Sequence, residues 1–476
     1  MAEPIRIPFG LGSDTGRHGP DAGPRHWNAH VETVDDGKHP TPIHSDDGFS
    51  LFSTITDGGA TRGTIVMGAY MYVVSGTILV KVDASGTATT IGGIPGTSKV
   101  SMAHNDKTGS RQLVIAVDGN KYLCEGDVLS DITDTDLPAA ISVTFLNQRI
   151  IYGIADGRFF WSALDAASDI SSIDFATAEG RPDGLVAVRE HLQEVWVFGA
   201  TSIEPWIDTG NATAPFRRSQ GSVIPKGCIG KDTIAALDKD LFWVGDDGSV
   251  YMAAGHALQR ISNFGVEEDI RATTDKSTIE AMAYFYGGHA WYVISAADWT
   301  WKFNRTISEK AGRPVWTERF SYGLNRWRAS HAVDFGGKII VGDYNTNKLY
   351  QISRTAYDEA GTTMVWRLRC APVHAYPNRM SHYKLHADFV LGVGLNSSNV
   401  HENDPQVGLR WSDDGGFSWS NQLTRDLGAI GVRHIPVVWD GLGDTGHTGR
   451  IYEFESSSPV VRTLQYVAVE AVLIGS

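Results

Sequence analysis

A hairpin pattern that recurs along the chain constrains the fold more than any other feature of the sequence. Residues 240–252 read DLFWVGDDGSVYM, two apolar arms around an Asp-Asp-Gly-Ser centre. Aromatic and β-branched residues favour pleated strands, and Asp-Gly supplies the positive φ angles that a tight hairpin turn needs. Similar hairpins, spaced 37 to 49 residues apart, begin at Tyr70, Gln112, Arg149, Glu194, Asp240, His289 and Lys338.

A short apolar run precedes these hairpins, for example Val100–Ala103 and Leu185–Val188, and the spacers after them are long enough for an outer strand. Four antiparallel strands per repeat predict a β-propeller, because a lone blade cannot bury its faces and neighbouring blades can. A period of roughly 45 residues lies between the WD40 and kelch lengths. We therefore expect an all-β protein with a propeller over residues 62–352. Six and seven four-stranded blades both remain open, and an ordinary multi-sheet β protein with accidental spacing is the weaker alternative.

The segments on either side of the repeats have a different character. Residues 1–61 are rich in Gly, Pro, His and Asp, which predicts an extended N-terminal arm that packs on something else. Residues 353–476 contain alternating stretches such as His382–Phe389. Such alternation marks half-buried antiparallel strands, so we expect a C-terminal β-sandwich or platform domain.

Charge and cysteine content disfavour a tight DNA-binding protein and a disulfide-stabilised secreted protein. The net charge is −14, and no long basic stripe is present, which disfavours tight binding to DNA phosphates but permits passive contact with double-stranded DNA. The three cysteines lie far apart, as expected of buried reduced thiols in a protein folded in a cytoplasm. The start MAEPIRIPFG lacks the apolar region of a signal peptide, and no apolar run approaches the roughly 20 residues of a membrane span. We expect no membrane insertion.

The most specific local motif is an Asp box, Ser412 to Trp419, which reads SDDGGFSW and matches S-x-D-x-G-x-[ST]-W. Asp414 can cap backbone N–H groups of the turn, Gly416 can adopt an unusual backbone conformation, and Trp419 can lock the hairpin into the core. Sialidases, which are propellers, carry several such boxes away from the catalytic centre. A single box outside the repeats favours a structural turn over a glycosidase.

Other chemical signals are weaker. His26 and His30 are four residues apart, but no helical pattern surrounds them, so a solvated polar loop is the better interpretation than a metal site. Residues 441–446 satisfy G-x-G-x-x-G, yet an alternating strand follows in place of the helix that a dinucleotide site requires. We therefore predict a protein that is not an enzyme, with no catalytic, cofactor-binding or metal-binding residues; whether an Asp-rich turn holds an ion stays open.

Several blocks, taken in order, resemble the tail hub proteins of short-tailed bacteriophages, also called packaged-DNA stabilisation proteins, tail accessory factors or nozzles. The blocks are Arg62-Gly63, Val100–His104, Pro182–Leu185, Phe198-Gly199, Ser202–Glu204, Lys226–Gly230, Trp327–Ile352, Ser412–Gly416 and Trp419–Asn421. They extend over most of the chain. Residues 14–48 depart from the family in being richer in His and Asp, which leaves the contacts of the arm open.

The resemblance implies a virion protein without catalysis that assembles in the bacterial host cytoplasm. It implies a homohexameric ring below the portal and adaptor proteins that closes the DNA exit channel, stabilises the packaged DNA, forms part of the ejection conduit and anchors a tail needle, tailspikes or fibres. The alternative is a sugar-binding or sialidase-like propeller glycosidase. Neither the interface residues nor the attached fibre and host receptor follow from the sequence.

Overall fold

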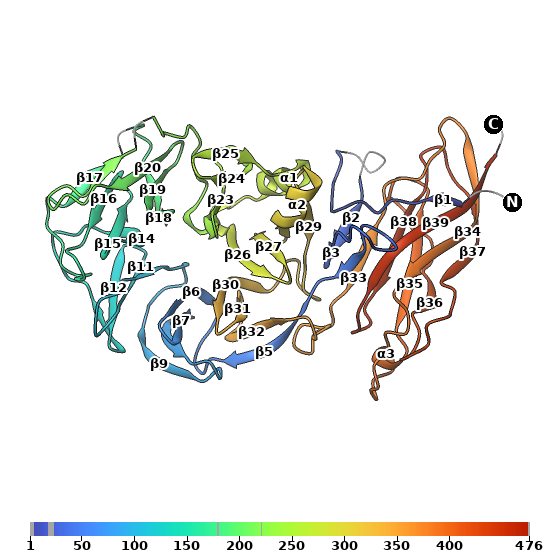
Figure 1. Ribbon diagram of the computed structural model, residues 1–476, viewed down its shortest axis with the longest axis horizontal. Helices are drawn as coiled ribbons and strands as arrows, with labels where there is room; N and C mark the ends of the chain where they lie inside the picture. Colours follow the sequence, from blue (N-terminus) through green and yellow to red (C-terminus); the bar gives the residue numbers. More distant parts are fainter. Residues whose placement is uncertain (1–3, 18–22, 179, 220, 475–476) are drawn as a thin grey trace.

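The chain forms a β-propeller and a β-sandwich that lie side by side in the computed structural model, with both termini at the far end of the sandwich (Figure 1). The structure describes residues 4–17, 23–178, 180–219 and 221–474. The all-β class predicted from the sequence is confirmed. None of the helices in these ranges has the length and apolar character needed to cross a membrane.

Within the described residues, the propeller has seven four-stranded blades. Each recurring hairpin forms the two middle strands of one blade, and the apolar run before it forms the innermost strand. The blades, numbered one to seven, are β6–β9 (Thr61–Met67, Tyr70–Ser75, Ile78–Val82, Ala88–Gly93), β10–β13 (Ser101–His104, Gln112–Val117, Asn120–Glu125, Val128–Asp131), β14–β17 (Ala140–Leu146, Arg149–Ile154, Arg158–Trp161, Phe175–Thr177), β18–β21 (Leu185–His191, Glu194–Gly199, Ile203–Asp208, Phe216–Arg218), β22–β25 (Ala235–Leu237, Asp240–Val244, Val250–Ala254, Ala257–Arg260), β26–β29 (Glu280–Tyr286, His289–Ser295, Thr300–Asn304, Trp316–Glu318) and β30–β32 with β5 (Ala329–Phe335, Lys338–Asp343, Lys348–Ser353, Gly48–Thr54).

Apolar side chains fill the space between each pair of neighbouring blades. Successive residues of a strand point to opposite faces, so Tyr292 and Ile294 of β27 pack toward blade five, whereas Trp291 and Val293 pack toward blade seven. Seven such clusters follow one another around the ring. The last cluster joins blade seven to blade one and so closes the ring. The propeller therefore has seven blades in the described residues, a number that the sequence left open between six and seven.

The propeller closes with a strand from the N-terminal segment. β5 pairs antiparallel with β32, with Phe49 opposite Ile352 and Leu51 opposite Tyr350. The predicted propeller boundary at residue 62 therefore omits a strand, because residues 48–54 belong to blade seven and not to an arm. The error arose because the closing strand is separated by about 300 residues from the hairpin it completes, so the local repeat does not include it.

Two sheets face each other in the sandwich and enclose one apolar core that includes Trp366, Leu385, Trp439 and Phe454. One sheet has the order β3-β4-β39-β34-β37, with β1 beside β39, and the other has the order β2-β33-β38-β35-β36. The strands are β1 (Pro4–Arg6), β2 (Arg25–Trp27), β3 (Ala29–Val31), β4 (Ile43–Ser45), β33 (Trp366–Arg369), β34 (Arg379–Phe389), β35 (Gln406–Ser412), β36 (Leu423–Asp426), β37 (Val438–Asp444), β38 (Ile451–Ser456) and β39 (Thr463–Ile474).

The N-terminal segment supplies strands to the sandwich, so it is not a free arm in its described parts. β2 pairs with β33 of the sandwich on one side and with β29 of blade six on the other. The second sandwich sheet is consequently continuous with blade six, in a nine-stranded sheet. Backbone hydrogen bonds thus join the two domains through β2, a strand that lies outside the repeated hairpin pattern.

Helices are few among the described residues. They are α1 (Phe264–Ala272), α2 (Arg305–Ala311), α3 (Val400–Asn403) and the 3₁₀ turns η2 (Lys231–Thr233) and η3 (Lys276–Thr278). Asn263 caps α1 by accepting from Val266 N, and Val266 and Ile270 pack into the core between blades five and six. α1 therefore covers the outer part of this pair of blades (Figure 1).

Candidate functional site: the junction between propeller and sandwich

Buried charges are concentrated where the N-terminal segment meets blade six. Asp46, which follows β4, has one carboxylate oxygen 2.8 Å from Lys302 Nζ and the other 3.0 Å from Arg319 Nη1. All three side chains are almost completely buried. Lys302 also lies over the Trp291 ring at 4.1 Å, and Arg319 over the Trp327 ring at 4.4 Å, which favours the cationic forms.

The ionisation of this group is set by competition between burial and mutual attraction. Burial opposes ionisation of Asp46, but the charges of Lys302 and Arg319 outweigh it and hold its pKa well below the usual range. Burial lowers the pKa of Lys302 to about 8 despite the attraction of Asp46. Near neutral pH the three groups form a buried charged cluster whose members line a polar pocket.

The charge cluster extends to blade seven and to the linker before the sandwich. Glu359, fully buried, lies 3.5 Å from Arg319 Nη2 and 3.4 Å from Arg328 Nε. It also accepts a hydrogen bond of 3.0 Å from Trp327 Nε1. Burial raises the pKa of Glu359, against the attraction of the Arg319 guanidinium. The N-terminal segment, two blades and the linker are thus held to one another through Arg319 and its two carboxylate partners.

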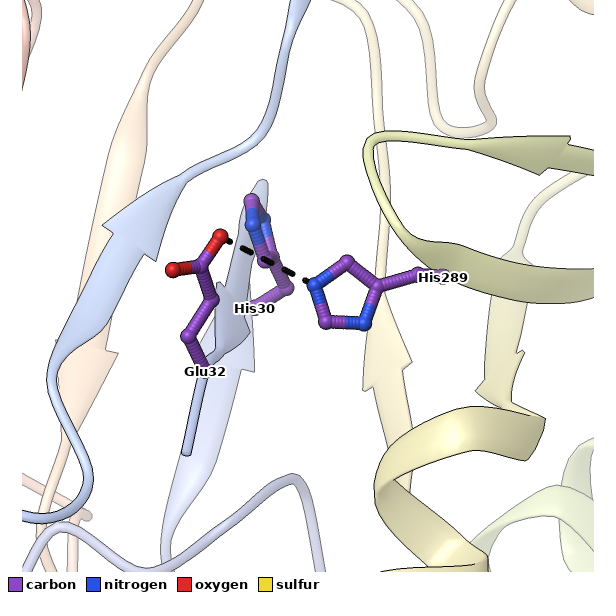
Figure 2. A group of neighbouring side chains, drawn as sticks. All are labelled: His30, Glu32 and His289. Carbon is purple, nitrogen blue, oxygen red and sulfur yellow. Dashed lines mark ion pairs between the residues drawn. The ribbon is translucent and has the colours of Figure 1, made fainter. Parts of the chain in front are cut away.

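A polar pocket with a cavity of about 220 Å³ opens beside this cluster. His30 of β3 and Glu32 just after it point into the pocket from one side, and His289 at the start of β27 points in from the other (Figure 2). His289 Nε2 lies 3.8 Å from one oxygen of Glu32, and His44 Nε2 lies 3.5 Å from the other. Donor atoms of His30, Glu32 and His289 all lie within 4.8 Å of one another, so these residues are able to hold a metal ion.

His26 and His30 are not in a solvated loop, as the sequence analysis expected. His26 is 0% exposed and its Nε2 lies 2.7 Å from the carbonyl of Phe9. His30 is also buried, and its Nδ1 lies 3.1 Å from Asp46. The expectation was wrong because both residues occupy short strands. β2 pairs with β33, far away in the sequence, and β3 pairs with the nearby β4, which in turn pairs with the distant β39.

The burial of His26 makes a pH dependence measurable. Burial lowers its pKa to about 4, against about 6.5 in the unfolded chain. The unfolded state therefore binds more protons below pH 6.5, and the stability of the fold falls as pH falls toward 4. We expect His26→Gln, which can keep the bond to Phe9, to reduce the loss of unfolding free energy between pH 7 and 5 by roughly 2 kcal/mol. Denaturant titrations at both pH values, with the exposed His401→Gln as control, check this; equal losses in the variant and the wild type would contradict it.

The Asp-box residues form a compact turn after β35, away from the junction pocket. Ser412 Oγ donates to Asp414 at 2.7 Å, and Gly416 N donates to Ser412 Oγ at 2.8 Å. Hydrogen bonds from Ser418 hold the pKa of Asp414 well below its usual value. Gly416 has a φ of +97°, a region that favours glycine. Trp419 is only half-buried: its ring lies 4.7 Å from the guanidinium of Arg369 and 4.8 Å from that of Arg410, so it packs on cations and not in the sandwich core.

The other glycine motif lies in a sandwich strand, and a second pocket lies at the propeller channel. Gly441 and Gly443 lie in β37, which pairs with β34 and opens no helix. The innermost strands enclose a second pocket. Among its described lining residues, Arg189 is the one arginine, whereas a sialidase would need several. Glu280 at this pocket is held by Lys99 at 2.6 Å and Arg326 at 2.5 Å.

Sequence reasoning missed the junction because its members are dispersed. Asp46 is separated by more than 250 residues from Lys302 and Arg319, and none of the three belongs to a recognisable motif. A weak local signal existed: His30 and Glu32 are two apart, which places them on the same side of an extended segment. His289, however, was noted only as the start of a hairpin.

The solved structures that are similar to this chain share little of its sequence. The extracellular domain of the putative hybrid two-component system BT4673 from B. thetaiotaomicron has a TM-score of 0.45 and 8% identity, over 73% of this chain and 45% of that one. The chain therefore spans less than half the length of that protein. The WD40 β-propeller domain of Doa1 has a TM-score of 0.41 and 13% identity, over 64% of this chain and 96% of that one. Streptogramin B lyase has a TM-score of 0.40 and 10% identity, over 68% and 96%. No curated protein sequence is detectably similar.

A protein-family model gives a more specific result. The model described as "Bacteriophage P22 Gp10, beta-propeller" matches residues 41–357. This range begins just before the closing strand β5 and ends in the linker after β32, so it contains all seven blades. It covers more than half of the chain. The chain therefore belongs to the Bacteriophage P22 Gp10 β-propeller family of phage tail proteins that stabilise packaged DNA, a structural family of the virion tail.

Proposed function

We propose that this protein is the tail hub, or nozzle, of a short-tailed phage. In this role a homohexameric ring lies below the portal and adaptor proteins and closes the DNA exit channel after packaging. The ring anchors a tail needle, tailspikes or fibres, and later forms part of the conduit through which DNA leaves. It assembles in the host cytoplasm, and no catalytic step is required.

The observation that carries this proposal is the family match across the whole propeller, residues 41–357. The charge of the chain is consistent with it. A net charge of −14 does not favour tight binding to DNA phosphates. Weak binding suits a conduit, because DNA must slide through it. The joined architecture also fits, because a plug under the pressure of packaged DNA needs domains that do not separate. The nine-stranded sheet and the buried charge cluster supply such a connection.

The proposal is tested in the phage with the full-length protein. A phage whose gene carries an early stop codon, grown in a host that does not suppress it, should fill its heads and then lose the DNA. Particles should be empty and not infectious, and wild-type protein supplied from a plasmid should restore them. Electron microscopy and the DNA content of purified particles measure both steps.

The control is the same phage in a suppressing host, which should yield full particles. Particles that lack the protein yet keep their DNA and infect normally would refute the proposal that this protein closes the DNA exit channel. Native mass spectrometry of the purified protein, alone and with the portal and adaptor rings, tests the hexamer separately. A protein that stays monomeric both alone and with these rings would contradict the proposed hexameric ring.

A further inference from the structure

The junction pocket contains a set of donors that is typical of transition-metal sites. His30, Glu32 and His289 present donor atoms within 4.8 Å of one another, and His44 Nε2 is 3.5 Å from Glu32. Donor atoms around a tetrahedral Zn²⁺ lie about 3.3 Å apart, since Zn–N distances are about 2.0–2.1 Å. Side-chain rotations that move the donor atoms by about 1 Å would bring them to that separation. Imidazoles with one carboxylate suit Zn²⁺ and similar ions, whereas Mg²⁺ and Ca²⁺ prefer oxygen donors alone.

Neighbouring groups already orient two of the imidazoles. His30 Nδ1 is bonded to the Asp46 carboxylate at 3.1 Å, which leaves Nε2 as the nitrogen available to an ion. A carboxylate behind a ligating histidine is the usual second partner in zinc sites. His44 Nδ1 lies 2.9 Å from Thr463 Oγ1, and its Nε2 is buried without a hydrogen-bond partner among the described residues. This imidazole nitrogen, directed at the Glu32 carboxylate, is therefore available to coordinate an ion.

We propose that His30, Glu32 and His289 bind a divalent transition-metal ion of the Zn²⁺ type, with His44 as the fourth ligand. The first two ligands come from the N-terminal segment at β3 and the third from blade six (Figure 2). The ion therefore cross-links the sandwich and the propeller at the same junction that the buried charges occupy. This site differs from the sequence-based expectation of no metal, and it does not depend on the proposed role in the tail.

Asn304 provides a sharp test of the role of His289. Its Oδ1 caps α2 by accepting from Ile307 N, so its Nδ2 faces His289 Nδ1 at 3.2 Å and donates to it. The ring proton of a neutral His289 then lies on Nε2, where the ion must bind. Metal binding moves this proton to Nδ1, and Asn304 offers no acceptor there. An Asp at 304 would keep the cap and accept the Nδ1 proton, so Asn304→Asp should raise metal affinity on the order of tenfold.

The experiment uses the full-length protein, stripped with a chelator and titrated with Zn²⁺ by calorimetry. We expect one ion per chain, a rise in Tm on binding, and visible absorption from Co²⁺ in the same site. His289→Ala should lower the affinity on the order of 100-fold or more, whereas exposed His434→Ala should not change it. Absence of stoichiometric binding by the wild type, or unchanged affinity in His289→Ala, would overturn the site. A gain in Asn304→Asp would support it, and a loss there as large as that of His289→Ala would contradict it.

Discussion

Replacing Asp46 with alanine should destabilise the protein by about 3–5 kcal/mol, because it leaves buried Lys302 without its carboxylate and buried Arg319 with Glu359 alone. Lys302 and Arg319 are 3% exposed each, and Asp46 faces both at 3.0 Å or less. Denaturant unfolding followed by tryptophan fluorescence measures the change, since Trp291 and Trp327 lie against the two cations.

Two matched variants separate burial of charge from loss of side-chain volume. In Asp46→Ala/Lys302→Met, one uncompensated charge is removed and the thioether keeps contact with Trp291, so we expect a recovery of at least about 1 kcal/mol relative to Asp46→Ala. Asp156→Ala breaks the exposed pair with Arg158 and should change stability by no more than about 0.5 kcal/mol. If Asp46→Ala costs as little as Asp156→Ala, the junction is not held by buried charge.

Local repetition made the propeller predictable from the sequence. Every blade repeats an apolar strand followed by a hairpin, and each hairpin predicted at Tyr70 through Lys338 forms the middle of a blade. Turn chemistry helped as well. At the tip of the Gln112 hairpin, Asp118 and Gly119 have φ angles of +48° and +82°, the pair of positive values that a type I′ turn requires.

The closing strand and the junction were not predictable by the same reasoning. β5 resembles any short strand in sequence, and only its pairing with β32 assigns it to blade seven. β2 and β3 are three residues long, too short to show alternation, so the histidines on them looked solvated. Both cases have one physical cause: partners separated by hundreds of residues decide burial, and a single sequence does not reveal which distant strands meet.

The same distant pairing predicts a large effect from a single apolar side chain in β5. Phe49 is 1% exposed and stacks on Trp327 and Tyr350, with ring centroids 5.5 and 5.2 Å apart. Phe49→Ala should cost about 3–5 kcal/mol of unfolding free energy, since it leaves a cavity in the core between blades six and seven. Leu51 lies in the same strand with 53% exposure, so Leu51→Ala should change stability by no more than about 0.5 kcal/mol.

The two residues lie on the same face of one strand and differ in burial, so any general effect on strand propensity is shared. Denaturant unfolding gives the free energies, and native-state hydrogen exchange shows where the ring opens. In Phe49→Ala the amides of β5 and β32 should lose protection before those of blades two to five, because β5 is the only pairing that ties the N-terminal segment to blade seven in the described strands. Equal stability of the two variants, or loss of protection spread evenly over all blades, would show that β5 does not close the ring.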